Sequence, residues 1–330
     1  MKKHDFKPYV VGGIFGVLGL ALLPVTGILN FAAEPEQSDL TDLYFRLASR
    51  QSIALRSYDL HVEPTDDPLM VERAAGHYEM VCADCHGSPA APPQRFAADL
   101  SPQPPLLMEQ LDRWRPDARL FYTVKHGIRR TAMPAWPSQK RDDEVWDMVA
   151  FLKVMPQMSA AEYEAMAGSA RCADCHGEEG QGGGAGLPRL DIQTPAYIED
   201  ALEAFRLGSR ESGTMKAAAA QLDQDAITRL AERYGLGIEV APEGNQRGAD
   251  IARLGIPGED VAACDSCHGP AGDPSYPRLA GQDRDYLLTQ LKLFSELGAE
   301  RGGHRANIMA KAIGTFSEED MEAVADWYGQ

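Results

Sequence analysis

The sequence predicts an all-α protein in which one membrane-spanning helix is followed by three small helical domains. Three observations lead to this prediction. A five-residue pattern, Cys-x-x-Cys-His, occurs three times at an interval of about one small domain. The segments between the copies carry apolar residues at helical spacing, and none shows a convincing alternating pattern typical of strands. Near the N-terminus, 22 consecutive residues carry no charge.

The first segment, residues 1–33, is predicted to form a cytoplasmic tip and a transmembrane anchor. Val10–Phe31 contains no charged side chain, and a helix of this length spans about 33 Å, enough to cross a bilayer core. A cleaved signal peptide is the alternative, but its apolar core is normally shorter. Lysines at positions 2, 3 and 7 precede the run and place the N-terminus in the cytoplasm. We therefore expect a single-pass protein of the inner membrane whose remaining residues lie in the periplasm.

Residues 34–68 connect the anchor to the rest of the chain. From Ser38 to Ser57, apolar residues recur at nearly helical spacing. This predicts a short amphipathic helix near the membrane surface or against the first domain. The next segment, Leu60–Pro68, contains two prolines and three acidic residues, a composition typical of a linker.

The repeated pattern uses all six cysteines of the chain. A zinc ribbon needs a second cysteine pair roughly 15–20 residues away, whereas the first cysteines here, at 82, 172 and 264, are 90 and 92 residues apart. A redox dithiol would sit in a βαβ pattern, and local pairs followed by histidine do not suit a disulfide framework. The pattern is instead the attachment signature of c-type haem, which binds covalently to both cysteines while the histidine reaches the iron. The sequence thus predicts three covalently bound haem c groups, on Cys82, Cys85 and His86, on Cys172, Cys175 and His176, and on Cys264, Cys267 and His268.

Each motif is predicted to lie near the start of a domain, with boundaries at 69–158, 159–240 and 241–330. A helix that carries aromatic residues closes each domain, at Asp142–Val154, Asp223–Tyr234 and Ser317–Tyr328. Ser317 suits the N-cap position, and the acids after it suit the first turn of a helix. Domains of this size have a small apolar core, to which a covalently bound haem would add.

Three methionines are the predicted second axial ligands, because methionine opposite histidine raises the potential of a haem used for electron transfer. Met133, Met215 and Met309 follow their motif histidines by 47, 39 and 41 residues. Met321 competes with Met309 but lies on the predicted closing helix, and core packing is the alternative for each methionine. Two histidines at similar distances, at positions 126 and 304, are expected at the surface or beside haem propionates.

Prolines and arginines that follow the motifs are candidates for the surroundings of each haem. An iron-bound imidazole needs an acceptor for its other ring nitrogen, often a backbone carbonyl. The carbonyls of Pro105, Pro188 and Pro277 are predicted to fill this role. Arg189 and Arg278 directly follow two of these prolines and could pair with haem propionates, with a solvent-facing position as the alternative.

The formal net charge of −17 argues against nucleic-acid binding, which needs basic patches. It suits either solubility or steering towards a partner with a basic docking face. A glycine-rich run at 180–186 lacks the Gly-Lys-Ser/Thr ending of a phosphate-binding loop and follows no predicted strand. We interpret this run as a flexible loop beside the second haem.

Taken together, these motifs resemble those of class I cytochromes c. The third predicted domain is similar to the cytochrome c4 and c553 type through Cys264–Gly269, Pro277–Gln282 and Met309. In the second domain Asp191–Gln193 replaces the Ala-Gly-Gln run, and the two domains together resemble the tandem dihaem arrangement of cytochrome c4. The first domain resembles membrane-anchored monohaem cytochromes c, notably at Met133–Trp136.

The resemblance implies an electron carrier that performs no bond chemistry of its own. Single electrons are expected to run from a quinol- or substrate-oxidising respiratory complex, through three haems, to a terminal oxidase or a soluble cytochrome. The alternative is a cytochrome c subunit of a membrane-bound periplasmic dehydrogenase of the alcohol or gluconate type. An enzyme such as a peroxidase or sulfur-compound oxidase is a further alternative. It would need a haem with an open or unusual sixth position, most readily the second haem, whose predicted sixth ligand is Met215.

Overall fold

The computed structural model describes residues 22, 25, 39–111, 116–168, 171–184, 186–259 and 261–330. Helices form the regular structure of these ranges, in which β-type pairing is confined to isolated bridges, so the all-α prediction is confirmed. The predicted anchor, Val10–Phe31, lies almost wholly outside the described residues. Among the helices of the described ranges, none combines the length and apolarity that a membrane span requires.

The first group of helices shares one hydrophobic core, in which α7 is central. Acidic residues at 142–144 occupy the first turn of α7, and every residue from Val145 to Leu152 is buried. Tyr78 is also fully buried and donates a hydrogen bond of 2.6 Å to the carbonyl of Gly87, so the end of the first haem motif is fixed to this core. The elements of this group are α2 (Asp39–Arg56), α3 (Pro68–His77), η2 (Tyr78–Cys82), α4 (Ala83–His86), η3 (Arg95–Asp99), α5 (Leu107–Gln110), α6 (Asp117–His126), α7 (Asp142–Val154), η4 (Met155–Gln157) and α8 (Ala160–Ala167).

Helix α8 belongs to the first core although the predicted boundary assigns it to the second domain. Its Tyr163 and Ala167 are buried with the residues of α3 and α7. The Tyr163 hydroxyl donates a 2.5 Å hydrogen bond to Glu79. The second motif therefore begins directly after a helix that is packed against the first group.

Two further groups of helices follow. The second contains α9 (Cys172–His176), α10 (Pro195–Arg206), α11 (Gly213–Ala219) and α12 (Gln224–Tyr234). The third contains α13 (Gln246–Leu254), α14 (Asp265–His268), α15 (Arg284–Leu297), η5 (Gly298–Arg301), α16 (Ala306–Ala312) and α17 (Glu318–Tyr328). The predicted closing helices are confirmed, since α12 is capped by Asp223 and α17 by Ser317, which forms a reciprocal capping box with Asp320.

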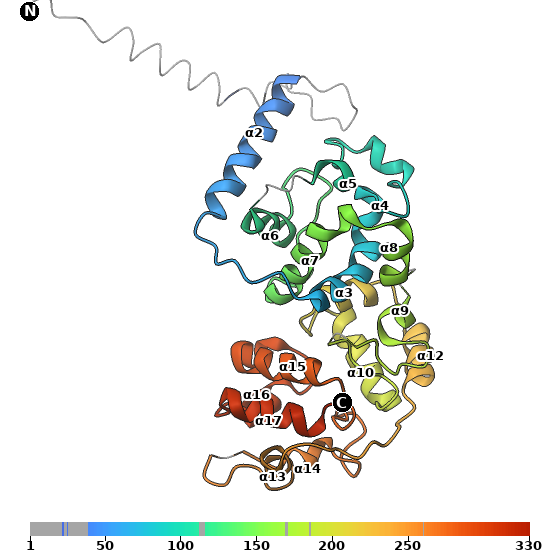
Figure 1. Ribbon diagram of the computed structural model, residues 1–330, viewed down its shortest axis with the longest axis vertical. Helices are drawn as coiled ribbons and strands as arrows, with labels where there is room; N and C mark the ends of the chain where they lie inside the picture. The colour runs from blue at the N-terminus through green and yellow to red at the C-terminus, as the bar shows by residue number, and fades with distance from the viewer. Residues whose placement is uncertain are drawn as a thin grey trace, which may run out of the picture.

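Figure 1 shows how the three groups are arranged. The blue-to-green helices lie at the top, and below them α9, α10 and α12 lie beside the orange-to-red helices. Backbone hydrogen bonds join the second and third groups, from Glu211 N to Arg301 O at 3.0 Å and from Gly303 N to Ser209 O at 3.0 Å. Contacts between segments that precede α11 and α16 thus connect these two groups.

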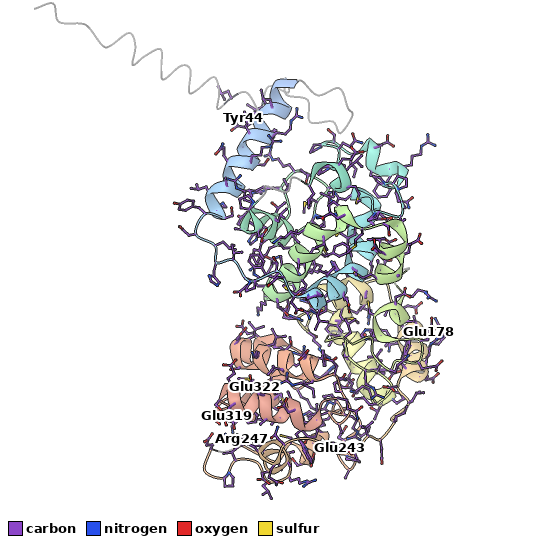
Figure 2. All side chains as sticks on the ribbon, viewed as in Figure 1. Tyr44, Glu178, Glu243, Arg247, Glu319 and Glu322 are labelled. Atoms are coloured by element: carbon purple, nitrogen blue, oxygen red, sulfur yellow. The ribbon has the colours of Figure 1, made fainter. Side chains whose placement is uncertain are left out.

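Helix α2 forms at the predicted place but leaves apolar side chains in solvent. Tyr44 and Leu55 are 67% and 79% exposed, and Figure 2 shows Tyr44 on this outlying helix. The helix contacts α6, and the Arg130 guanidinium lies 5.3 Å from the centre of the Phe45 ring. Extended backbone follows, until Asp67 caps α3.

Candidate haem sites

Each Cys-x-x-Cys-His motif lies on a single helical turn. The spacing of three and four residues brings the two cysteines and the histidine to one side of such a turn. The motifs coincide with the end of η2 and all of α4, with α9, and with α14 together with the residue before it. The six cysteines are free thiols. Burial raises the pKa of Cys82 to about 12 and of Cys264 to about 11, so both remain neutral near pH 7.

The three motif histidines share one hydrogen-bond arrangement. In each, the ring Nδ1 lies 2.8 to 2.9 Å from the carbonyl oxygen of a downstream proline. Because a carbonyl can only accept, Nδ1 carries the proton, and the lone pair of Nε2 is left free for a metal ion. The pairs are His86 with Pro105, His176 with Pro188 and His268 with Pro277. These are the prolines that the sequence analysis named.

The three candidate methionines are half-buried and lie in different local structures. Met133 lies in the loop between α6 and α7, where its N–H donates to the Thr131 hydroxyl at 3.1 Å. Met215 lies in the first turn of α11, and its N–H donates to the capping Ser212 at 3.1 Å. Met309 lies within α16 and packs against the third core. Each is thus held by a defined backbone contact or a core, as an axial ligand must be.

The remaining candidates contact protein groups. Arg189 forms a bidentate pair with Asp191, at 3.0 and 2.7 Å. The Arg278 guanidinium donates to the backbone carbonyls of Gly269, Pro270 and Gly272. Both guanidiniums therefore brace the loops that carry the proline carbonyls. The His126 ring packs against Tyr122, with ring centres 4.4 Å apart.

Sequence reasoning missed two glutamines that link the second and third sites. The Gln282 amide bonds the backbone of Arg189, accepting from N at 2.6 Å and donating to O at 3.0 Å. Gln193 makes the reciprocal pair with the backbone of Arg278, both bonds at 2.9 Å. Each contacted arginine directly follows a histidine-binding proline. The available signal was that each glutamine stands five residues after its proline, and that the two glutamines are 89 positions apart.

Two buried arginines at the same contact were also missed. Arg210 and Arg301 are 7% and 6% exposed, and neither forms an ion pair with a carboxylate of the described residues. Arg210 donates to the hydroxyls of Tyr197 and Tyr286 at 3.1 Å each. The Nε of each arginine is buried and has no hydrogen-bond partner within the described part of the chain. Burial, together with the charge of Arg210, lowers the pKa of Arg301 to about 9. Such a pair of positive charges is suited to an anionic group.

Comparison with known proteins agrees with this description. The family model for subunit III of cbb3-type cytochrome c oxidase matches residues 70–152. The cytochrome c family model matches residues 161–230 and 257–328. The chain therefore belongs to the class I c-type cytochromes and contains c4-like domains.

Individual relatives place the chain beside cytochrome c4. A thiosulfate dehydrogenase electron acceptor from Stutzerimonas stutzeri is 34% identical over 174 residues, which are 48% of this chain and 77% of that protein. Cytochrome c4 from Thiocapsa roseopersicina is 31% identical over 165 residues, 47% of this chain and 84% of that protein. A solved cytochrome c4 from Acidithiobacillus ferrooxidans is 30% identical and covers 48% of this chain and 96% of its own, with a TM-score of 0.42.

Covalent haem c is the cofactor that this family implies, and the residues present fit it. In each motif the two free cysteines stand one helical turn apart, and the histidine that follows them has an available Nε2. The buried, carboxylate-free guanidiniums of Arg210 and Arg301 are suited to propionate groups. The chemistry of these donors thus matches an iron porphyrin that carries two carboxylates.

Proposed function

We propose that this chain is a membrane-anchored, periplasmic cytochrome that holds three haem c groups and relays single electrons. The observation that carries the number three is the repeated arrangement at His86, His176 and His268, each bound to a proline carbonyl after a cysteine pair. The uncharged run Val10–Phe31 and the lysines before it support the anchor and its orientation. Attachment to a membrane would keep the relay beside its partners.

The chain's residues prepare each site for electron transfer. Bound haem c supplies a one-electron couple between ferric and ferrous iron. The proline carbonyls orient the three imidazoles and increase their basicity. We assign Met133, Met215 and Met309 to the opposite side, where thioether sulfur raises the potential and excludes water. The cysteine pairs would hold each haem covalently and so would keep it in a fixed position for electron transfer.

We further propose that the donor is a periplasmic dehydrogenase that oxidises a sulfur compound such as thiosulfate. Two relatives, from Stutzerimonas stutzeri and Thiomonas intermedia, are described as electron acceptors of thiosulfate dehydrogenase. The acceptor of the electrons would be a terminal oxidase or a soluble cytochrome. The match of residues 70–152 to a cytochrome subunit of cbb3-type oxidase supports an oxidase.

A permanent subunit of a membrane-bound dehydrogenase is the second candidate. In that case this chain would hold no catalytic site, and the dehydrogenase would deliver electrons within one complex. Gentle detergent extraction of the native membrane, capture through a C-terminal tag and mass spectrometry would separate the candidates. Stoichiometric recovery of a dehydrogenase would favour the subunit, whereas oxidase or quinol-oxidising subunits would favour the respiratory relay.

Haem number and ligation are tested on the purified full chain. The intact mass should exceed that of the polypeptide by three haem groups. The ferric spectrum should be fully low-spin, with the far-red methionine–iron charge-transfer band for all three sites. A mass with fewer haems would refute the three-centre relay. A high-spin fraction near one third would contradict the assignment of three methionine ligands and would favour an enzyme with one open site.

A further inference from the structure

The first group of helices meets the second through the segments that carry two of the candidate methionines. Residues 136–144, just after Met133, lie against residues 211–215, which end at Met215. The contact is polar and mostly buried, and it joins parts of the chain about 70 residues apart. The place where the two sites approach each other is therefore defined by the side chains of these two segments.

Glu144 is the central residue of this contact. Its carboxylate accepts hydrogen bonds from the Ser212 hydroxyl at 2.6 Å and from the Gly213 N–H at 2.5 Å. It also accepts from Trp136 Nε1 at 3.2 Å and forms a 3.0 Å ion pair with Arg141. Its side chain is only 11% exposed. One buried carboxylate thus satisfies donors from both groups, and loss of its charge would leave several of them poorly paired.

A chain of hydrogen bonds passes through Glu144 from one methionine segment to the other. Trp136 lies three residues after Met133 and donates to the carboxylate. Ser212 donates to the same carboxylate and accepts from the backbone N–H of Met215 at 3.1 Å. These hydrogen bonds therefore link Trp136, in the segment that follows Met133, to the backbone of Met215.

Gly213 allows the two segments to approach closely. A Cβ atom at this position would lie 2.0 Å from Trp136 Nε1 and 2.6 Å from the neighbouring ring carbon Cε2. Non-bonded atoms do not approach closer than 3.0 Å at a Cβ. An alanine here would therefore separate the indole from the second group by about 1 Å, since the ring is buried and cannot turn away.

Neighbouring residues tie the same contact to the third group. The Glu211 side chain accepts from Ser138 at 2.6 Å, and its backbone N–H donates to the Arg301 carbonyl at 3.0 Å. Lys140 and Glu300 form an ion pair at 2.8 Å directly between the first and third groups. The three groups thus meet at one junction.

We propose that Glu144 is a positioning residue that holds the first haem site against the second, and that electrons cross between these sites where Trp136 meets Gly213. This inference rests on the proposed three-haem relay. In the transfer one iron is oxidised and the next is reduced by the same electron, and no bond forms or breaks. A rigid contact keeps the gap short, and the transfer rate falls steeply as the gap widens.

A second contact between the two groups provides the competing route. A Cβ at Gly76, on α3, would lie 2.9 Å from the Sγ of Cys175, a haem-attaching cysteine of the second motif. This contact is a close packing of α3 against α9, in contrast to the hydrogen-bonded chain at Glu144. Gly76→Ala perturbs it and leaves the Glu144 contact intact, so the two routes can be tested separately.

The experiment uses the full chain with its haems and four variants: Glu144→Gln, Gly213→Ala, Gly76→Ala and the control Glu322→Gln. Glu322 is an exposed carboxylate on α17, away from the junction (Figure 2). Flash reduction by a soluble flavin injects one electron, and the internal redistribution appears as a phase independent of protein concentration. Hydrogen exchange of residues 211–216 reports docking without reference to the haems. The haem spectrum verifies that each iron keeps its ligands.

The expected result is a several-fold slower internal phase in Gly213→Ala and Glu144→Gln, with unchanged spectra. Amide exchange at Gly213 should rise roughly tenfold or more in Glu144→Gln, because one neutral amide oxygen replaces the two charged oxygens that accept these hydrogen bonds. Glu322→Gln should match the parent. The proposal would be overturned if amide exchange were unchanged in Glu144→Gln. It would also be overturned if Gly76→Ala slowed the internal phase as much as the other two variants, or were alone in slowing it. If exchange were faster in Glu144→Gln but the parent protein showed no internal phase, the relay would be refuted instead.

Discussion

His77 should make the first group of helices sensitive to mild acid. Its ring is 2% exposed and packs on Trp136 with ring centres 4.3 Å apart. Nδ1 is buried and has no hydrogen-bond partner among the described residues. Burial lowers the pKa of His77 from 6.5 to about 4. The folded state therefore holds this imidazole neutral, whereas the unfolded chain takes up a proton below pH 6.5.

The direction and size of the effect follow from linkage between protonation and folding. A depressed histidine pKa contributes stability that is fully present above pH 6.5 and is lost as the pH falls towards 4. Between about pH 7.5 and about pH 5 the loss amounts to about 2 kcal/mol. His77→Phe keeps an aromatic ring against Trp136 and removes the titration. We expect this variant to lose about 2 kcal/mol less than the parent over the same interval.

Urea unfolding of the full chain, followed by far-ultraviolet circular dichroism at the two pH values, measures this difference. Carboxylates also titrate in this interval, so the quantity of interest is the parent-minus-variant change in unfolding free energy. His61→Phe is the matched control, because His61 is exposed and forms only a 3.7 Å contact with Glu63; it should retain the parent's pH dependence. If His77→Phe and the parent lost the same free energy, the burial argument would be refuted.

Three further predictions concern the second haem site and the contact between the second and third groups. Gln282→Ala should cost roughly 2–3 kcal/mol of stability, since two backbone groups of Arg189 lose their partner. Spectroelectrochemistry should also show a changed potential of the second haem, although residue 282 belongs to the third group. A shift confined to the third haem would contradict this. Met215→Leu should convert about one third of the haem to high-spin iron in the optical spectrum, and an unchanged low-spin spectrum would remove Met215 as ligand. Gly302→Ala should lower the melting temperature more than Gly208→Ala. Both glycines have positive φ, at 79° and 72°, but a Cβ at 302 would lie 1.9 Å from the Ser209 carbonyl, whereas one at 208 would meet nothing within 4 Å. Equal melting temperatures would exclude the steric contribution.

Local signals in the sequence were sufficient for the helices and for the cysteine motifs. The closing helix at Asp142–Val154 was predicted with its observed bounds, since acids mark its first turn and apolar residues follow at helical spacing. Ser317 was recognisable as a cap for the same reason. Haem attachment needs two cysteines and a histidine within one helical turn, so five adjacent residues contain the whole signal.

Contacts between distant segments could not be read in the same way. Pro105, Pro188 and Pro277 stand 19, 12 and 9 residues after their histidines, so spacing alone suggested them without establishing a contact. In the sequence, Glu144 is recognisable only as an acidic residue in the first turn of a helix. In the fold, its carboxylate reaches a segment about 70 residues away along the chain.

The sequence by itself thus determined the all-α class and the cysteine–histidine motifs, because each depends on residues close together in the chain. Only the tertiary structure decided which glutamine braces which histidine-binding loop, as in the exchange between Gln193 and Gln282. It also brought Arg210 and Arg301 together in a buried place. Such pairings satisfy buried polar groups across the contacts between helical groups. They depend on how whole groups of helices dock, which no local pattern encodes.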